Sequence, residues 1–306
     1  MIEYHLWIPK SKKPRVHQRR LRRECEGELV QIDASFHAWF EDRAPKCHLH
    51  ILVDDATSKI MGGFFDVGET TEGYYQACLR YFQKMGRPLS LYSDKRGTFV
   101  VNNGVERRET QFARAMKELD IQMITAHSPQ AKGRIERAFG TLQERLVWEM
   151  RLHHISSIEE ANDFLPGFIE TYNNKYSQQP SNPLNAHRPL NSKKPLKHIL
   201  CIKEERVITK NLELSYNNQV FQLRPNETEV GLKGSKITVI TTLQKEILLE
   251  HRGVFIKYTI YGENMDTSYD ASLENMIKNC KTKTTYIPPK YHPYKRLAKR
   301  RNLASI

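Results

Sequence analysis

Between residues 28 and 176, short apolar segments alternate with helical patterns in an order that few folds accommodate. Three strand-like runs rich in Val, Ile, Leu and Phe come first, and then helix, strand, helix, strand and two further helices. The strands are expected at 28–36, 47–54, 59–67, 88–93 and 121–125, and the helices at 70–85, 111–119, 131–150 and 158–172. We therefore expect an α/β domain with a mixed five-stranded sheet flanked by helices.

Turn-forming residues refine this arrangement. The segment Asp54–Ser58 reads as a tight turn, which makes the second and third strands an antiparallel hairpin. Pro166 should bend or break the last helix, because proline lacks the N–H that a helix interior uses.

Beyond residue 200 the pattern changes to short strands. They are expected at 207–209, 212–216, 219–223, 236–242, 246–250 and 254–260, with Asn217-Asn218 as a two-residue hairpin turn. We expect a small antiparallel β-barrel. The predicted organisation is a basic arm at 1–26, a core domain at 27–176, a linker at 177–199, the barrel at 200–265 and a basic tail at 266–306.

The net charge of +13 is concentrated at the two ends of the chain. Residues 1–23 contain eight Lys/Arg and one acid, and residues 278–306 contain nine Lys/Arg and no acid. The remainder has 31 basic and 34 acidic residues, so it is close to neutral. Basic extensions of this kind commonly bind the phosphates of nucleic acids, although they can also be solvated tails.

The cysteines give no sign of a disulfide framework or a metal finger. They are five scattered residues without a Cys-x-x-Cys pair, which indicates free thiols: Cys25, Cys47, Cys78, Cys201 and Cys280. The chain does not open with a secretory signal, and no apolar run approaches the length of a membrane span. We expect a cytoplasmic, nucleoid-associated protein without membrane contact.

Three acidic residues stand out by their positions. Asp33 lies within the first strand, Asp94 follows the fourth, and Glu136 lies in the first turns of a long amphipathic helix. Taken singly, each has an ordinary explanation: a turn or cap for either aspartate, and for Glu136 an ion pair with Lys132 one helical turn earlier. Taken together, carboxylates that converge on one point suit a two-metal site for phosphoryl transfer.

Several motifs resemble the integrase catalytic core of DDE-type insertion-sequence transposases, which has the RNase H-like fold and is related to retroviral integrases. They are Gln31-Ile-Asp33, Val53-Asp-Asp-Ala-Thr57, Tyr92-Ser-Asp94, Ser128-Pro-Gln-Ala-Lys-Gly-Arg-Ile-Glu136 and Tyr172-Asn-Asn174, and the 212–223 hairpin resembles the family's small barrel. The resemblance covers roughly residues 5–295. It implies that Asp33, Asp94 and Glu136 are catalytic and bind two Mg²⁺ or Mn²⁺ ions.

The resemblance also implies contacts with DNA. Gln130, Lys132 and Arg134 would bind it from the loop that leads into the long helix. The alternative for this loop is an ordinary helix start with Ser128 as N-cap. The basic arm would add four arginines to the DNA-binding set: Arg19, Arg20, Arg22 and Arg23.

Other polar residues are expected to be structural. Asp54 and Asp55 read as turn formers rather than ligands. His48 and His50 share one strand face without further ligands at a suitable spacing, so packing is the preferred explanation.

The expected activity is hydrolysis of DNA at element ends followed by transfer of the 3′-hydroxyl into target DNA. The protein would work as a homo-oligomer, because two ends are processed together. Two features depart from the family pattern: 41 residues separate Asp94 from Glu136, and the chain begins where a helix-turn-helix region would finish. The second feature leaves three explanations open. The chain is a fragment, its reading frame is truncated, or it relies on a partner polypeptide for that part of DNA binding. The alternative function is that of a truncated, non-catalytic regulator of transposition that binds DNA.

Overall fold

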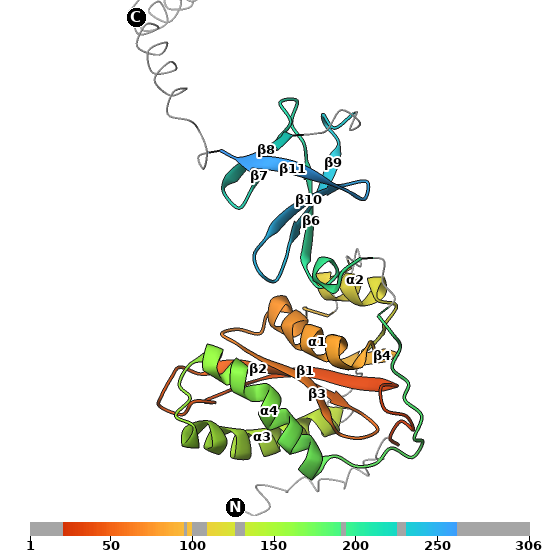
Figure 1. The fold of residues 1–306 in the computed structure, drawn as a ribbon, viewed down its shortest axis with the longest axis vertical. Coiled ribbons are helices and arrows are strands. Elements are labelled where there is room, and N and C mark those ends of the chain that lie inside the picture. The colour runs from red at the N-terminus through yellow and green to blue at the C-terminus, as the bar shows by residue number, and fades with distance from the viewer. Residues whose placement is uncertain are drawn as a thin grey trace, which may run out of the picture. The chain divides into compact units, whose positions relative to one another are not determined.

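The computed structural model describes residues 21–94, 97–99, 109–125, 132–190, 194–224 and 231–261 (Figure 1). The core elements are β1 (Leu29–His37), β2 (Cys47–Asp54), β3 (Ile60–Asp66), α1 (Thr71–Met85), β4 (Ser90–Ser93), α2 (Gln111–Glu118), β5 (Gln122–Thr125), α3 (Gly133–Leu152) and α4 (Ile158–Tyr176).

The five core strands form one mixed sheet in the order β3-β2-β1-β4-β5. β1 pairs antiparallel with β2, and β2 with β3, whereas β1, β4 and β5 run parallel. The predicted RNase H-like strand arrangement and the predicted hairpin at Asp54–Ser58 are therefore confirmed. The sheet places the middle of β1 next to the end of β4, and the candidate site lies there.

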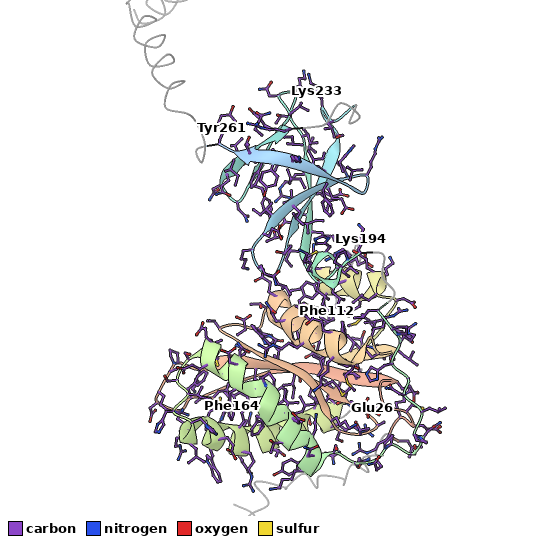
Figure 2. The ribbon with its side chains drawn as sticks, in the orientation of Figure 1. Glu26, Phe112, Phe164, Lys194, Lys233 and Tyr261 are labelled. Carbon is purple, nitrogen blue, oxygen red and sulfur yellow. The ribbon has the colours of Figure 1, made fainter. Side chains whose placement is uncertain are left out.

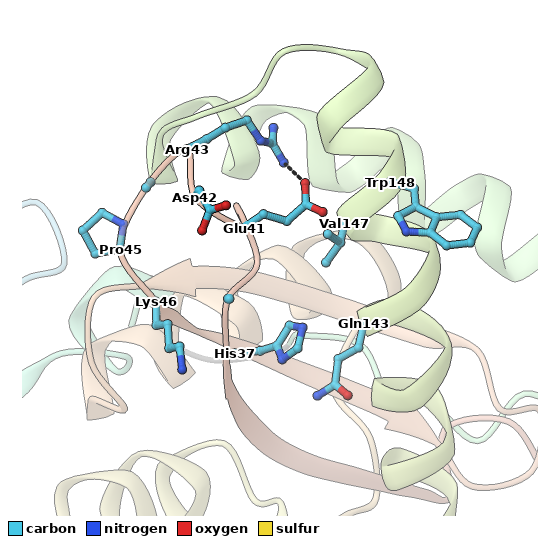
Figure 3. A pocket seen from close by; sticks show the side chains of 11 residues that line it. His37, Glu41, Asp42, Arg43, Pro45, Lys46, Gln143, Val147 and Trp148 are labelled. Atoms are coloured by element: carbon cyan, nitrogen blue, oxygen red, sulfur yellow. Dashed lines mark ion pairs between the residues drawn. The ribbon is translucent and has the colours of Figure 1, made fainter.

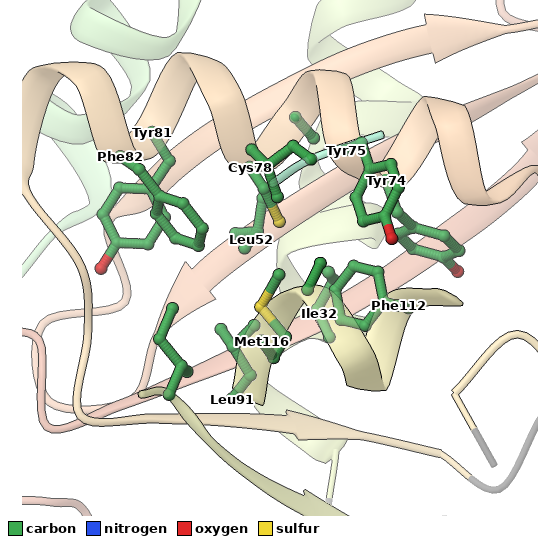
Figure 4. Packing of buried hydrophobic residues seen from close by; sticks show 14 of the residues in the cluster. Ile32, Leu52, Tyr74, Tyr75, Cys78, Tyr81, Phe82, Leu91, Phe112 and Met116 are labelled. Atoms are coloured by element: carbon green, nitrogen blue, oxygen red, sulfur yellow. The ribbon is translucent and has the colours of Figure 1, made fainter. Parts of the chain in front are cut away.

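Apolar side chains cover both faces of this sheet. Ile32 and Leu52 pack with α1 and α2 in one buried cluster, which Figure 4 shows. Ile51 and Val53 belong to a second cluster with α3 and α4 on the opposite face. Figure 2 shows the side chains of both layers, with Phe112 on α2 and Phe164 on α4. Because side chains alternate along a strand, neighbouring residues of β1 face different helices.

Of the bend or break predicted at Pro166, the break does not occur, since α4 continues through this residue to Tyr176. Proline cannot donate to the carbonyl of Asn162 four residues earlier. The guanidinium of Arg80 donates to that carbonyl instead, with 3.0 Å between Nη1 and O. The lost helical hydrogen bond is thus replaced from α1, and a capping box of Ser157 and Glu160 stabilises the start of the helix.

A short 3₁₀ helix, η2 (Leu196–His198), precedes the second sheet. Its strands are β6 (Ile202–Val207), β7 (Glu213–Tyr216), β8 (Gln219–Arg224), β9 (Lys236–Thr241), β10 (Ile247–His251) and β11 (Val254–Ile260). They form a six-stranded sheet in the order β6-β9-β10-β11-β8-β7, as the prediction of a small antiparallel β domain requires. Asn217 and Asn218 both have positive φ in the predicted turn between β7 and β8. The first strand begins earlier than its predicted range of 207–209.

By its internal contacts the chain divides into two compact units. Among the described residues, one unit contains 21–205 and 238–253, and the other contains 206–237 and 254–261. The domain boundaries expected from the sequence stay a prediction. Within the described part of the chain, no helix is long and apolar enough to cross a bilayer.

Candidate active site

Asp33 owes its direction to the alternation of side chains along β1. Its neighbours Ile32 and Ala34 are buried in the cluster of α1 and α2, so Asp33 faces the side of the sheet that α3 covers. Asp94 directly follows β4. The register pairs Gln31 with Tyr92, and the two aspartates lie two residues beyond this pair on parallel neighbours.

Lys132 lies close to the carboxylates of both aspartates. Its Nζ lies 2.9 Å from Oδ2 of Asp33 and 3.7 Å from Oδ2 of Asp94. The lysine is only 5% exposed, and the side chains of Asp33 and Asp94 are 17% and 26% exposed. Thus one cation already lies between two carboxylates from different strands.

One carboxylate oxygen in this cluster has no hydrogen-bond partner in the part of the chain that the structure describes. Oδ1 of Asp33 is buried and has no hydrogen-bond partner among the residues that the structure describes. A buried anionic oxygen without a donor is unfavourable unless a cation or water satisfies it. Hard divalent cations prefer carboxylate oxygens, so the donor set at Asp33 and Asp94 fits Mg²⁺ or Mn²⁺.

Glu136 lies in the first turn of α3, and its side chain is exposed. The described residues contain no group of three or more His, Cys, Asp or Glu placed to hold a metal ion. The structure therefore brings two of the three predicted ligands together around Lys132 and does not gather Glu136 with them. The three-residue metal site stays a prediction.

Of the predicted DNA-binding residues, two point inward. Lys132 pairs with the aspartates as described, and the guanidinium of Arg134 lies 2.9 Å from Oδ1 of Asp55, with its side chain 9% exposed. In this conformation neither side chain is presented to a DNA backbone. α3 starts at Gly133 with Lys132 as its N-cap residue and without a side-chain cap bond.

The remaining members of that set are only partly described. Gln130, Arg19 and Arg20 lie outside the described residues, as does Ser128. Arg22 donates to the Asp55 and Ala56 carbonyls at 3.1 and 3.2 Å.

Arg23 is the most accessible described member of the set. Its side chain is 47% exposed and pairs with Glu28 at 3.2 Å. Its role in binding DNA stays a prediction, as do the roles of the others.

The turn after β2 contains a second pair of acids, which are fully buried. Asp54 accepts hydrogen bonds from the Gly27 N–H at 2.9 Å and from the N–H and hydroxyl of Thr57 at 2.8 Å each. Burial raises the pKa of the Asp54 carboxyl, and these hydrogen bonds oppose the rise. The sequence-based interpretation of Asp54 as a turn former is confirmed.

Asp55 has partners far away in the sequence. Its Oδ1 accepts from Gln31 Nε2 at 2.9 Å as well as from Arg134, and its Oδ2 accepts from the Arg23 N–H at 2.9 Å. Gln31 in turn accepts a hydrogen bond at Oε1 from the N–H of Ile135 at 3.2 Å. Sequence reasoning missed this network. The available signal was Gln31, which lies two residues before Asp33 and therefore on the same strand face.

Two further features do not belong to the site. His50 is buried against Tyr74, and burial lowers its pKa to about 4, so it is a neutral packing residue as predicted. An open hollow beside α3 is lined by residues that include His37, Gln143 and Trp148 (Figure 3). Its lining contains none of the three candidate acids.

Comparison with known proteins gives two curated relatives. A protein of Sinorhizobium fredii, y4bF, whose name describes it as a candidate transposase, is 37% identical over 279 residues, which cover 90% of this chain. The transposase for insertion sequence IS1202 of Streptococcus pneumoniae is 32% identical over 293 residues, 92% of this chain. The chain resembles insertion-sequence transposases. It spans about 60% of the length of each of these two transposases, and no family model matches it.

Solved structures similar to this transposase-like chain include retroviral integrases. The HTLV-2 integrase catalytic core domain in complex with magnesium is 18% identical, with a TM-score of 0.40, and the match covers 52% of this chain and 93% of that one. An intasome of simian T-cell lymphotropic virus in complex with the PP2A regulatory subunit B56 gamma matches 82% of this chain and 83% of its own at 15% identity and a TM-score of 0.42. The fold assignment rests on the strand order itself.

Proposed function

We propose that this chain is a DNA transposase that hydrolyses DNA at the ends of its element and then joins the exposed 3′-hydroxyl to target DNA. The observation that carries the proposal is the convergence of Asp33 and Asp94 on a buried cation, with Oδ1 of Asp33 lacking a hydrogen-bond partner among the described residues. The similarity to two transposases supports the same activity.

The residues that would hold Mg²⁺ or Mn²⁺ are Asp33, Asp94 and Glu136, and two ions would bind. When bound, the ions stabilise negative charge on the attacking and the leaving oxygen of a phosphodiester. Asp33 is held by β1 and Asp94 by the end of β4, and both strands belong to a buried sheet. This rigid support fixes the carboxylates before substrate arrives, as a pre-organised site requires.

Lys132 would act as an internal counter-ion. Two carboxylates this close repel each other, and the ammonium of Lys132 neutralises that repulsion while no metal is bound. Since it occupies the space between the carboxylates, it must move when divalent cations bind. It then becomes available to a DNA phosphate, which reconciles its buried position with the predicted DNA contact.

The basic residues of the two chain ends would also hold DNA, and Gln130 would contact a base or a sugar of that DNA. Because two element ends must be cut and joined together, the working form would be at least a dimer on DNA. The protein would act in the cytoplasm at the nucleoid.

The test is a strand-transfer assay with the full chain, labelled oligonucleotides that copy the element ends, and a plasmid target in Mn²⁺. Joined products that disappear in Asp94→Asn are expected. DNA binding without products in the unsubstituted chain would favour the alternative function of a non-catalytic regulator. Products that persist in Asp94→Asn would reject this aspartate as a catalytic residue.

A further inference from the structure

Two buried groups far apart in the sequence meet at the start of α3. Asp55, at the turn after β2, is fully buried and forms an ion pair with Arg134 in the first turn of α3. The pair is shielded from water, since the two side chains are 0% and 9% exposed. Removing one member of a buried ion pair leaves the other charge unpaired, so this contact strongly constrains the helix start.

A second connection runs through Gln31 on β1. This residue is fully buried, and both polar atoms of its side-chain amide form hydrogen bonds. Nε2 donates to Asp55, and Oε1 accepts from the backbone N–H of Ile135. The first N–H groups of a helix have no partner within the helix, and Lys132 supplies no side-chain cap. Gln31 therefore caps α3 from the neighbouring strand.

These contacts connect β1, which carries Asp33, with the start of α3, which carries Glu136. Gln31 lies two residues before Asp33 on the same face of β1, and Ile135 directly precedes Glu136. The backbone N–H of Asp55 also donates to the Leu29 carbonyl at 2.9 Å, which fixes the turn to the start of β1. The position of Glu136 relative to Asp33 thus depends on this network.

We propose that Asp55, Gln31 and Arg134 are positioning residues that fix the first turn of α3, which carries Glu136, to β1, which carries Asp33. The proposal rests on the proposed function for the role of Glu136, but the clamp on the helix can be measured without activity. It assigns Arg134 to the interior of the protein rather than to a DNA phosphate. Asp54 provides a matched control, because it is an equally buried neighbour whose side-chain hydrogen bonds go to Gly27 and Thr57 and not to the described residues of α3.

The first experiment is backbone hydrogen exchange on the full chain without DNA or metal, for the unsubstituted protein, Asp55→Asn, Arg134→Gln and Asp54→Asn. We expect faster exchange over residues 133–140, relative to α1, in the Asp55 and Arg134 variants. Asp54→Asn should accelerate exchange in the β2–β3 turn and leave 133–140 unchanged. Unchanged exchange over 133–140 in Asp55→Asn would overturn the proposal.

The second experiment measures the Mn²⁺ concentration that gives half-maximal strand transfer. Loss of a residue that orients a metal ligand typically weakens metal binding by about tenfold or more, so Asp55→Asn should raise this concentration by about tenfold. The double variant Asp55→Asn/Arg134→Gln should recover part of the loss, because it leaves no buried charge unpaired. An unchanged Mn²⁺ requirement in Asp55→Asn would reject the positioning role.

Two further variants separate the possible failures. Gln31→Met keeps the ion pair intact and should still loosen 133–140, so the proposal can be tested even if Asp55→Asn does not fold. If Arg134→Gln lowers DNA affinity and its salt dependence without loosening 133–140, Arg134 is a DNA contact and the proposal is wrong. If the unsubstituted chain has no strand-transfer activity while the exchange results hold, the proposed function fails and the clamp stands.

Discussion

Two pairs of aspartates near the same sheet differ in the groups that bond to their carboxylate oxygens. Asp54 and Asp55 are fully buried, and fixed donors of the protein bond to all of their carboxylate oxygens. Asp33 and Asp94 share one lysine ammonium, and an oxygen of Asp33 has no partner among the described residues. The first pair is bound by several backbone N–H groups and buried side chains, whereas the second is neutralised by a single lysine side chain, which we propose is exchanged for a metal ion.

If the proposed function holds, this difference separates structural acids from metal ligands better than burial does. A carboxylate whose oxygens all accept hydrogen bonds from buried protein groups has fewer free lone pairs, and less room, for a metal ion. A carboxylate with an unused oxygen and an exchangeable counter-ion keeps free lone pairs and room for such an ion. Substitutions at Asp33 and at Asp54 should therefore have opposite effects on activity and on stability.

The largest expected effect is on activity. Asp33→Asn should lower strand transfer by about a thousandfold, because metal ions contribute several kcal/mol to phosphoryl transfer and each 1.4 kcal/mol is about tenfold in rate. The assay compares initial rates of joining under equal DNA occupancy. Asp54→Asn is the control and should retain activity at temperatures where it is folded; comparable loss in both variants would erase the distinction between the two pairs.

In stability the order should be reversed: Asp54→Asn should lower the free energy of unfolding more than Asp33→Asn does. In Asp54→Asn the new amide NH₂ must face a backbone N–H donor, either that of Gly27 or that of Thr57, which should lower the free energy of unfolding by about 2 kcal/mol. In Asp33→Asn the amide oxygen can still accept from Lys132, the NH₂ takes the place of Oδ1, and Lys132 keeps Asp94 as its ion-pair partner, so the loss should be smaller, about 1 kcal/mol. Urea denaturation measures the free energy of unfolding of both variants. A larger loss in Asp33→Asn than in Asp54→Asn would contradict this prediction.

The smallest expected effect concerns the counter-ion. Lys132→Met should increase the Mn²⁺ affinity of the DNA-free chain by about fivefold or more, because the buried ammonium no longer competes with the metal for the two carboxylates. Isothermal calorimetry of the unsubstituted and Lys132→Met chains provides the comparison. If Mn²⁺ affinity is unchanged and only the salt dependence of DNA binding decreases, Lys132 is a DNA contact without a counter-ion role.

Much of the core could be predicted from the sequence because its signals are local. Apolar runs and turn residues determined the strands β1 to β5, and the asparagines at 217 and 218 determined the hairpin turn of the second sheet. The continuous helix at Pro166 could not be predicted, since the donor that replaces the lost bond comes from Arg80 in α1.

The sequence singled out Asp33 and Asp94, which the structure brings together, but it did not predict their partners. The inward direction of Lys132 and Arg134 depends on acids that are distant in the chain and lie beneath the start of α3. A basic residue after a Ser-Pro-Gln sequence is equally compatible with DNA contact, so local pattern alone could not separate the two. The role of Asp55 was hidden for the same reason, because a turn former and a buried ion-pair partner have the same sequence signature.

The most direct test of the central claim is Mn²⁺ binding to the DNA-free chain, followed by electron paramagnetic resonance of the free ion, in the unsubstituted protein, Asp33→Asn and Asp54→Asn. The account predicts that Asp33→Asn weakens binding by about tenfold or more and that Asp54→Asn binds as the unsubstituted protein does. Equal binding in all three, or loss in Asp54→Asn alone, would contradict the assignment of Asp33 to an exchangeable cation site.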